Sequence, residues 1–193
     1  MTTKSALVSC VKDLYLRGLT TSVSGNHSIR LGEWMWITPS GVPRYLLRAS
    51  ELVNVNIQTG RLRGKKSPST ESEMHRMIYL ACPGIRGIVH THSPYTIAAS
   101  ITSGFTQVIE EAKIVVGKPV IIPHRPSGSK ELAEAVAEAF EDGAKAVIVK
   151  NHGVVAGSAD IHQARAIIES LEEWSKILAI SRLFGRTIEY LGG

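Results

Sequence analysis

The sequence predicts an α/β fold, a single domain over residues 1–193 in which helices cover a mixed sheet. Segments with the apolar period of a helix are interspersed with segments that alternate as strands do. Several strand-like segments are separated by only a short turn, which favours antiparallel pairs, and no simple alternation of strand and helix is present. The 193 residues are 44% apolar and 20% charged, and they contain no repeat and no linker. Length and composition therefore suit one globular domain.

Helical and strand-like segments follow in order along the chain. Helices are predicted over residues 4–17, 71–81, 94–100, 129–142 and about 159–184. Strands are predicted in a hairpin over 24–41, then at 52–58 and 87–92, and on both sides of a turn within 144–158. The stretch from 106 to 124 is predicted to be rich in strand. Thr70 and Glu73 match a capping box at the start of the second helix, and Ser158 is the predicted cap of the last one.

Charge and cysteine content narrow the class of protein. The net charge is +5, from 22 Lys+Arg against 17 Asp+Glu, which suits anionic small substrates as well as nucleic acid and decides little alone. The densest basic run, residues 61–66, reads as a solvated hairpin or loop, and without interleaved aromatic residues it predicts no nucleic-acid partner. Cys10 and Cys82 are expected to be free thiols in a reducing compartment. No signal peptide or membrane span is apparent, so we expect a cytoplasmic protein without a membrane partner.

Two histidines end a short apolar strand in "GIVHTHSP". Residues i and i+2 of a strand point to the same face, so His90 and His92 would stand side by side, about 7 Å apart at their Cα atoms. Two imidazoles so placed can converge on one metal ion. The alternative is a pair of surface histidines on an edge strand.

A third histidine favours the metal site. In "VIVKNHGVV", His152 also follows an apolar run and precedes a turn glycine. If the two strands are neighbours, the three imidazoles meet at one edge of the sheet. Three neutral histidines leave a fourth position open, as in a catalytic zinc site. The remaining histidines, which we expect to be hydrogen-bonded or exposed, are His27, His75, His124 and His162.

Three small polar turns could bind an anion. Ser69 and Thr70 offer hydroxyls at a predicted helix N-terminus, which is a favoured place for a phosphate. Residues 24–26 and 38–41 are turns with predicted free backbone N–H groups. The adjacent Glu71 is favoured by the helix dipole in the first helical turn, or else is a carboxylate held near the metal.

With these motifs in view, the sequence resembles the class II aldolase and adducin-type family, and most of all its zinc-dependent L-fuculose-1-phosphate aldolases. The resemblance runs from about Leu7 to Phe184. It rests on the ordered motifs "SGNHSIR", "ITPSGVP", "PSTESEMHRMIY", "VHTHSP" and "NHGVVA". It implies a three-layer α/β/α fold with a mostly antiparallel central sheet, and a homotetramer with active sites at subunit interfaces.

The resemblance also implies roles for individual residues. His90, His92 and His152 would be the zinc ligands. Glu71 would be the catalytic acid/base, able to touch the metal before substrate arrives and helped by a pKa that burial raises. The implied phosphate-binding residues are Gly25, Asn26, Ser40, Gly41, Ser69 and Thr70.

The implied reaction is cleavage of a ketose 1-phosphate, such as L-fuculose 1-phosphate, to dihydroxyacetone phosphate and a short aldehyde. Zinc would act as a Lewis acid that stabilises the enediolate. The family's mid-chain tyrosine acid is missing from "TQVIEEAK", where Glu110 and Glu111 stand, and Tyr190 is the candidate for a second, C-terminal tyrosine. Alternatives are a dehydratase of a 5-substituted ribulose 1-phosphate, a pentose-phosphate 4-epimerase and a non-catalytic adducin-like module.

Overall fold

A computed structural model describes residues 3–102, 105–106 and 108–185. Within these residues, eight strands form one sheet in the order β4-β3-β2-β1-β5-β8-β7-β6. The strands are β1 (Asn26–Leu31), β2 (Trp34–Ile37), β3 (Val53–Asn56), β4 (Leu62–Arg63), β5 (Gly87–Thr91), β6 (Val120–Ile122), β7 (Ala146–Val149) and β8 (Gly153–Ser158). Every neighbouring pair is antiparallel except β6 with β7, which is parallel. The predicted mixed, mostly antiparallel sheet is confirmed.

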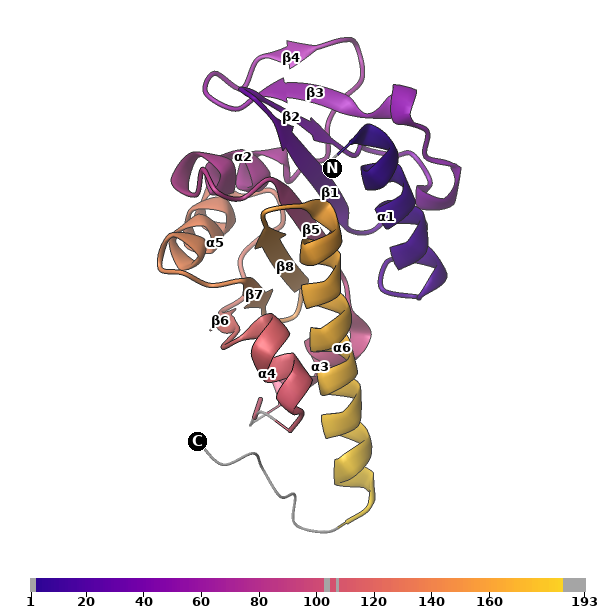
Figure 1. Ribbon diagram of the computed structural model, residues 1–193, viewed down its shortest axis with the longest axis vertical. Coiled ribbons are helices and arrows are strands. Elements are labelled where there is room, and N and C mark those ends of the chain that lie inside the picture. The colour runs from indigo at the N-terminus through magenta and orange to yellow at the C-terminus, as the bar shows by residue number, and fades with distance from the viewer. Residues whose placement is uncertain (1–2, 103–104, 107, 186–193) are drawn as a thin grey trace.

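Helices cover both faces of this sheet and make three layers (Figure 1). The α-helices in the described part of the chain are α1 (Lys4–Leu16), α2 (Ser72–Ala81), α3 (Pro94–Ile101), α4 (Glu110–Val116), α5 (Lys130–Glu141) and α6 (Ile161–Leu183). Helices α2 and α5 pack against each other on one face, whereas α1, α3 and α4 gather around the long α6 on the other. The α/β class and the three-layer arrangement are therefore as predicted.

The sheet separates two apolar clusters because its strands alternate. Along β7, Ala146 and Ile148 face the cluster under α1 and α6, while Val147 and Val149 face the cluster under α2 and α5. All four side chains are fully buried. A central strand with apolar side chains on both faces fits a sheet covered on both sides.

The segment from 106 to 124 differs from the prediction. Among the described residues of this segment, only β6 (Val120–Ile122) is a strand, and residues 110–116 form α4. Helix α4 packs on α6 and buries Ala112 and Val116, so tertiary contacts outweigh the β propensity of its valines and isoleucines. The basic run 61–66 includes the exposed edge strand β4, paired with β3 in a hairpin, as predicted.

Two helix starts also differ from the prediction. Helix α6 is capped by Asp160, whose Oδ1 accepts from the backbone N–H groups of His162 and Gln163, so the predicted cap Ser158 lies outside the helix. Helix α2 has Glu71 at its N-cap and no side-chain cap. The predicted capping box is wrong because Glu73 instead forms a two-pronged ion pair with Arg76, at 2.6 and 2.8 Å.

The thiols are free, as predicted: Cys10 is buried in α1, and Cys82 lies at the C-cap of α2 rather than inside the helix. Among the described residues, no helix is both long enough and apolar enough to span a bilayer.

Candidate metal centre

Three histidines meet where β5 ends beside the start of β8. His90 is the fourth residue of β5 and His92 follows its end. His152 lies in the turn just before β8, which pairs with β5 in antiparallel fashion. Their ring centroids are 5.0 to 5.4 Å apart, and their potential ligand nitrogens all lie within 4.8 Å of one another. The predicted convergence of the imidazoles is confirmed. Their role as ligands stays a prediction.

The turn that carries His152 depends on two unusual backbone positions. Asn151 adopts a left-handed conformation, with φ of 60°, which asparagine tolerates better than most residues. Gly153 has no room for a side chain, because a Cβ there would lie 2.3 Å from the carbonyl oxygen of Thr91 and 3.0 Å from the ring of His90. The sequence "NHG" therefore allows β8 to pass close to β5, with His152 in the turn just before β8.

The hydrogen bonding of His90 suits a metal ligand. Its Nδ1 lies 3.1 Å from the carbonyl oxygen of Val154, which can only accept, so this nitrogen carries the proton. The buried Nε2 has no hydrogen-bond partner among the described residues and faces Oε2 of Glu71. A histidine held by a backbone carbonyl with its other nitrogen free is the usual arrangement around a bound metal.

Burial keeps the imidazoles of His92 and His152 neutral at pH 7. It lowers the pKa of His92 to about 4, with further contributions from His90 and His152. Burial, followed by the proximity of His90, also lowers the pKa of His152. Metal ions bind the neutral imidazole. The donor set therefore fits a divalent transition metal such as zinc.

Glu71 faces the histidines from the N-cap of α2. Its carboxylate is 3% exposed, with Oε2 3.1 Å from Nε2 of His90 and Oε1 3.3 Å from Nε2 of His152. Asn26 donates to Oε2 over 2.8 Å, and Ser127, in the loop before α5, donates to Oε1 over 2.8 Å. The structure thus brings Glu71 to the three histidines, as predicted.

The predicted rise in the pKa of Glu71 is wrong for this arrangement. Burial alone would raise it, but the close approach of His90, the Asn26 hydrogen bond and His152 together outweigh burial. The pKa is therefore held well below its usual range, and the carboxylate is ionised at neutral pH. An ionised carboxylate can accept a proton or approach a metal ion.

A buried hydrogen-bonded chain stands behind Asn26. Its Oδ1 accepts from Nε2 of His75 over 2.7 Å, so Nδ1 of His75 carries no proton and accepts from Ser28 over 2.7 Å. The Ser28 oxygen in turn accepts from the hydroxyl of Tyr79 over 2.8 Å. Each group in the chain has a defined direction, which fixes the Asn26 amide with Nδ2 toward Glu71.

The predicted anion-binding segments lie next to one another. The peptide N–H of Ser40 donates to Ser67 over 3.1 Å and that of Ser69 donates to Thr38 over 3.1 Å, so residues 38–41 run beside 67–70. The N–H groups of Ser40 and Ser69 are thus occupied, and for Ser40 this contradicts the prediction that the N–H groups of the turn 38–41 are free. In the described part of the chain, the N–H groups of Gly25, Gly41 and Thr70 have no such partner.

The remaining histidines vary in their surroundings. His75 is hydrogen-bonded, and His124 and His162 are exposed, as predicted. His27 differs, because it is fully buried and neither ring nitrogen has a partner among the described residues. Burial, followed by the charge of Arg44, lowers its pKa well below the usual range.

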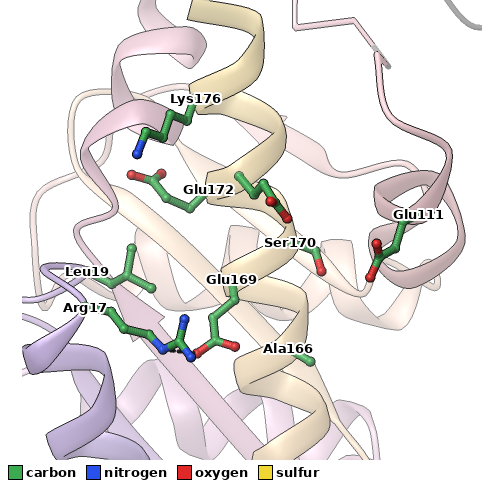
Figure 2. A pocket seen from close by; sticks show the side chains of 9 residues that line it. Arg17, Leu19, Glu111, Ala166, Glu169, Ser170, Glu172 and Lys176 are labelled. Carbon is green, nitrogen blue, oxygen red and sulfur yellow. Dashed lines mark ion pairs between the residues drawn. The ribbon is translucent and has the colours of Figure 1, made fainter. Parts of the chain in front are cut away.

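A separate cleft of about 500 Å³ lies along α6, away from the histidines. Figure 2 shows Glu169 ion-paired with Arg17 in this cleft, over 3.1 Å. Its Glu172 is committed to the N-terminus of α3, accepting from the backbone N–H groups of Tyr95 and Thr96 over 2.9 and 2.8 Å. Glu169 and Glu172 thus have structural partners.

Comparison with known proteins identifies the family. The model of the class II aldolase and adducin N-terminal domain matches residues 5–179. The chain belongs to this family. The class II aldolase chain is 37% identical over 165 residues to an L-fuculose phosphate aldolase of Methanococcus maripaludis strain S2, covering 85% of this chain and 89% of that protein. Class II aldolases are metal-dependent lyases, and this chain is an enzyme of that kind.

Two further relatives are similar to this chain over nearly its whole length. A 3-oxo-tetronate 4-phosphate decarboxylase of Haemophilus influenzae is 33% identical over 195 residues, covering 97% of this chain and 91% of that protein. The crystal structure of L-fuculose-1-phosphate aldolase from Thermus thermophilus superposes with a TM-score of 0.84 at 28% identity, covering 94% of this chain and 95% of that one. The Thermus thermophilus protein shares the fold of this chain, and the two relatives are named for different reactions.

Two residues that hold the Glu71 carboxylate in place were not predicted from the sequence. Ser127 and His75 both act on the carboxylate, the first directly and the second through Asn26. A helical histidine and a serine in a Pro-Gly-rich loop carry no motif, so no signal in one sequence singles them out.

Proposed function

We propose that this class II aldolase acts as one domain over residues 1–193 and cleaves a ketose 1-phosphate to dihydroxyacetone phosphate and a short aldehyde. The observation that carries the proposal is the site itself. The potential ligand nitrogens of three imidazoles lie within 4.8 Å of one another, and an ionised, buried carboxylate contacts two of the rings. In this proposal His90, His92 and His152 hold Zn²⁺. The ion supplies Lewis-acid stabilisation of the negative charge that develops on the substrate oxygens.

Glu71 is the proposed acid/base, and it can also touch the metal before substrate arrives. The carboxylate is ionised in the resting site and so can take up a proton, and the Asn26 and Ser127 hydrogen bonds hold its oxygens in place. A proton on the carbon beside the substrate carbonyl would pass to or from this carboxylate.

The proposed phosphate site is formed by Gly25, Asn26, Ser40, Gly41, Ser69 and Thr70. The adjacency of residues 38–41 and 67–70, together with the N-terminus of α2 beside Thr70, supports it. Asn26 serves the carboxylate as well, because one of its Nδ2 hydrogens points to Glu71.

The departing aldehyde oxygen needs a proton donor. Glu110 and Glu111, in the segment that lacks the family's tyrosine, are exposed at the start of α4, and Tyr190 lies outside the described residues.

A second candidate function follows from the decarboxylase relative. Loss of CO₂ from a phosphorylated 3-oxo acid leaves the same kind of enediolate as carbon–carbon cleavage by an aldolase, but it needs no acid for an aldehyde oxygen. The 33% identity over 97% of this chain favours this candidate. Dehydration of a 5-substituted ribulose 1-phosphate, pentose-phosphate 4-epimerisation and an adducin-like module rank lower. The epimerases of the family carry Asp where this chain has Glu71, and the histidine triad is complete here.

The experiment is incubation of the zinc-loaded protein with a panel of ketose 1-phosphates and phosphorylated 3-oxo acids. Release of dihydroxyacetone phosphate together with an aldehyde from a ketose 1-phosphate supports the aldolase. Release of CO₂ from a phosphorylated 3-oxo acid supports the decarboxylase, because loss of CO₂ can also leave dihydroxyacetone phosphate. Loss of water without cleavage would instead establish the dehydratase. If the fully metal-loaded protein turns over none of the ketose phosphates, the aldolase proposal is contradicted.

We also propose a cytoplasmic homotetramer with active sites at subunit interfaces. The C-terminal half of α6 extends beyond the sheet (Figure 1), and its exposed apolar side chains Ile177, Ile180, Leu183 and Phe184 support burial against another copy. Light scattering of the purified protein measures the assembly.

A further inference from the structure

Arg44 is a buried cation at the base of two of the anion-binding turns. It begins the short 3-10 helix that follows Pro43, and it is only 4% exposed. Among the described residues, no carboxylate lies within ion-pair distance of its guanidinium. Buried charges in proteins are normally paired, so an arginine in this position needs an explanation.

Main-chain carbonyl oxygens from both turns surround the guanidinium. In the first turn, Nη2 donates to Val23 over 3.0 Å and to Gly25 over 2.7 Å, and Nε donates to Ser24 over 3.2 Å. In the second turn, Nη1 donates to Val42 over 3.2 Å, with a longer contact of 3.4 Å to Pro39. The backbone N–H of Arg44 also donates to Ser22 over 2.8 Å. One side chain thus ties residues 22–25 to residues 39–42.

These contacts determine where the N–H groups of the first turn point. In a trans peptide, the C=O of one residue and the N–H of the next point in opposite directions, and the described chain contains no cis bond. Because the carbonyls of Ser24 and Gly25 point to Arg44, the N–H groups of Gly25 and Asn26 point away from it. At position 25 the φ is 69°, and the neighbouring His90 leaves no room for a Cβ, so this turn requires glycine.

Carbonyl dipoles satisfy the donors of the guanidinium but leave its net charge unbalanced. Burial accordingly lowers the pKa of Arg44 from its usual value. An anionic group bound on the outer side of the same turns would supply the missing opposite charge. A phosphoryl dianion does so better than a neutral hydroxyl or a sugar ring.

We propose that Arg44 is a positioning residue for the phosphoryl group, holding the turns 22–25 and 39–42 in their binding arrangement and placing a positive charge behind them. The inference rests on the proposed function in one respect, that the anionic end of the substrate is a phosphate.

The test measures inorganic phosphate binding to the zinc-loaded protein by calorimetry, for wild type, Arg44→Lys and Arg44→Met. Lysine keeps the charge but cannot reach carbonyls of both turns, whereas methionine removes the charge as well. We expect the dissociation constant to rise at least about 10-fold for Arg44→Lys and further for Arg44→Met. Arg61→Met, which removes an exposed arginine from the β3–β4 hairpin, is the matched charge control and should bind as wild type does.

Kinetics separate positioning from a merely structural role. With the active substrate, the KM of the Arg44 variants should rise, while their kcat should stay within about threefold of wild type. Bound zinc should stay at its wild-type level. If Arg44→Met does not fold, the Arg44→Lys comparison decides alone. Unchanged phosphate affinity in a folded Arg44 variant overturns the inference, as does a wild-type protein that binds no phosphate. Wild-type phosphate binding that Arg44→Lys weakens, without turnover of any ketose phosphate, overturns the proposed aldolase and leaves the role of Arg44 standing.

Discussion

Asn26 donates a 2.8 Å hydrogen bond from Nδ2 to Oε2 of Glu71, and both side chains are buried. The direction of this bond is set from behind, since Oδ1 of Asn26 is occupied by Nε2–H of His75. A rotation of the Asn26 amide by 180° would place two donors against each other and two acceptors against each other. The carboxylate therefore meets a donor whose orientation is fixed by residues outside the site.

Asn26→Asp should lower kcat about 10- to 100-fold, because an outer-shell partner of this kind typically contributes that much. The new carboxylate still accepts from His75 but faces Glu71 with a negative oxygen where a donor stood. Steady-state kinetics on the zinc-loaded variant measure the effect. The control is Asn56→Asp at the end of β3, where Oδ1 only accepts, from Thr59, and aspartate can replace it. Wild-type kcat in Asn26→Asp would contradict the role of this hydrogen bond.

His92→Ala should reduce bound metal at least about 10-fold at limiting zinc, because two histidines do not hold the ion as three do. Elemental analysis after dialysis measures the metal per chain. His162→Ala, which removes an exposed histidine from the start of α6, should retain it.

Glu71→Gln should separate chemistry from metal binding. The amide is nearly the same size as the carboxylate but cannot accept the substrate proton, so turnover should be abolished while the histidines keep the metal. Normal activity in Glu71→Gln would show that another group is the base.

Gly153→Ala should damage the site through the backbone. Its Cβ would lie 2.3 Å from the carbonyl oxygen of Thr91 and about 3 Å from the rings of His90 and His92. We expect a loss of about 2–4 kcal/mol in the free energy of unfolding, together with weaker metal binding. Urea denaturation and zinc titration measure the two effects. Gly84→Ala has open space around its Cβ and is the control. A Gly153→Ala protein as stable as wild type would mean that β5 and β8 can separate without cost.

The metal-free protein should lose stability as the pH falls below about 6.5. Burial lowers the pKa of His75 to about 3 and that of His27 well below its usual value, so both stay neutral in the folded state. In the unfolded chain, these two histidines take up protons near pH 6.5, whereas in the folded state they do not. Stability therefore falls as the pH falls. Each such histidine contributes a slope of about 1.4 kcal/mol per pH unit, and for His75 the window runs down to about pH 3.

Urea denaturation between pH 7 and pH 4 measures this slope. His75→Gln should reduce it by about one histidine's contribution. His162→Gln changes an exposed side chain and provides the comparison. A slope that is the same in wild type and His75→Gln would show that His75 is protonated in the folded protein or neutral in both states.

The sequence predicted well wherever a short pattern determines the outcome. The i, i+2 spacing of His90 and His92 and the strand-turn-strand pattern around His152 predicted one cluster, and the structure contains it. The segment 106–124 was predicted poorly, because α4 is helical through its packing on α6 and not through its own propensity. The expected pKa of Glu71 was wrong for the same kind of reason, since it depends on neighbours that are distant in the chain.

By itself the sequence determined the α/β class, the helix and strand periods, and the residue types able to bind a metal, because these depend on local spacing. Only the tertiary structure decided that β8 lies beside β5, that Asn26, Ser127 and two histidines surround Glu71, and that Arg44 is buried among the carbonyls of two turns. Those relationships join residues that are distant in the chain, such as His90 and Val154, which are 64 positions apart. The packing of the whole sheet sets such distances and charges, and no short stretch of sequence encodes them.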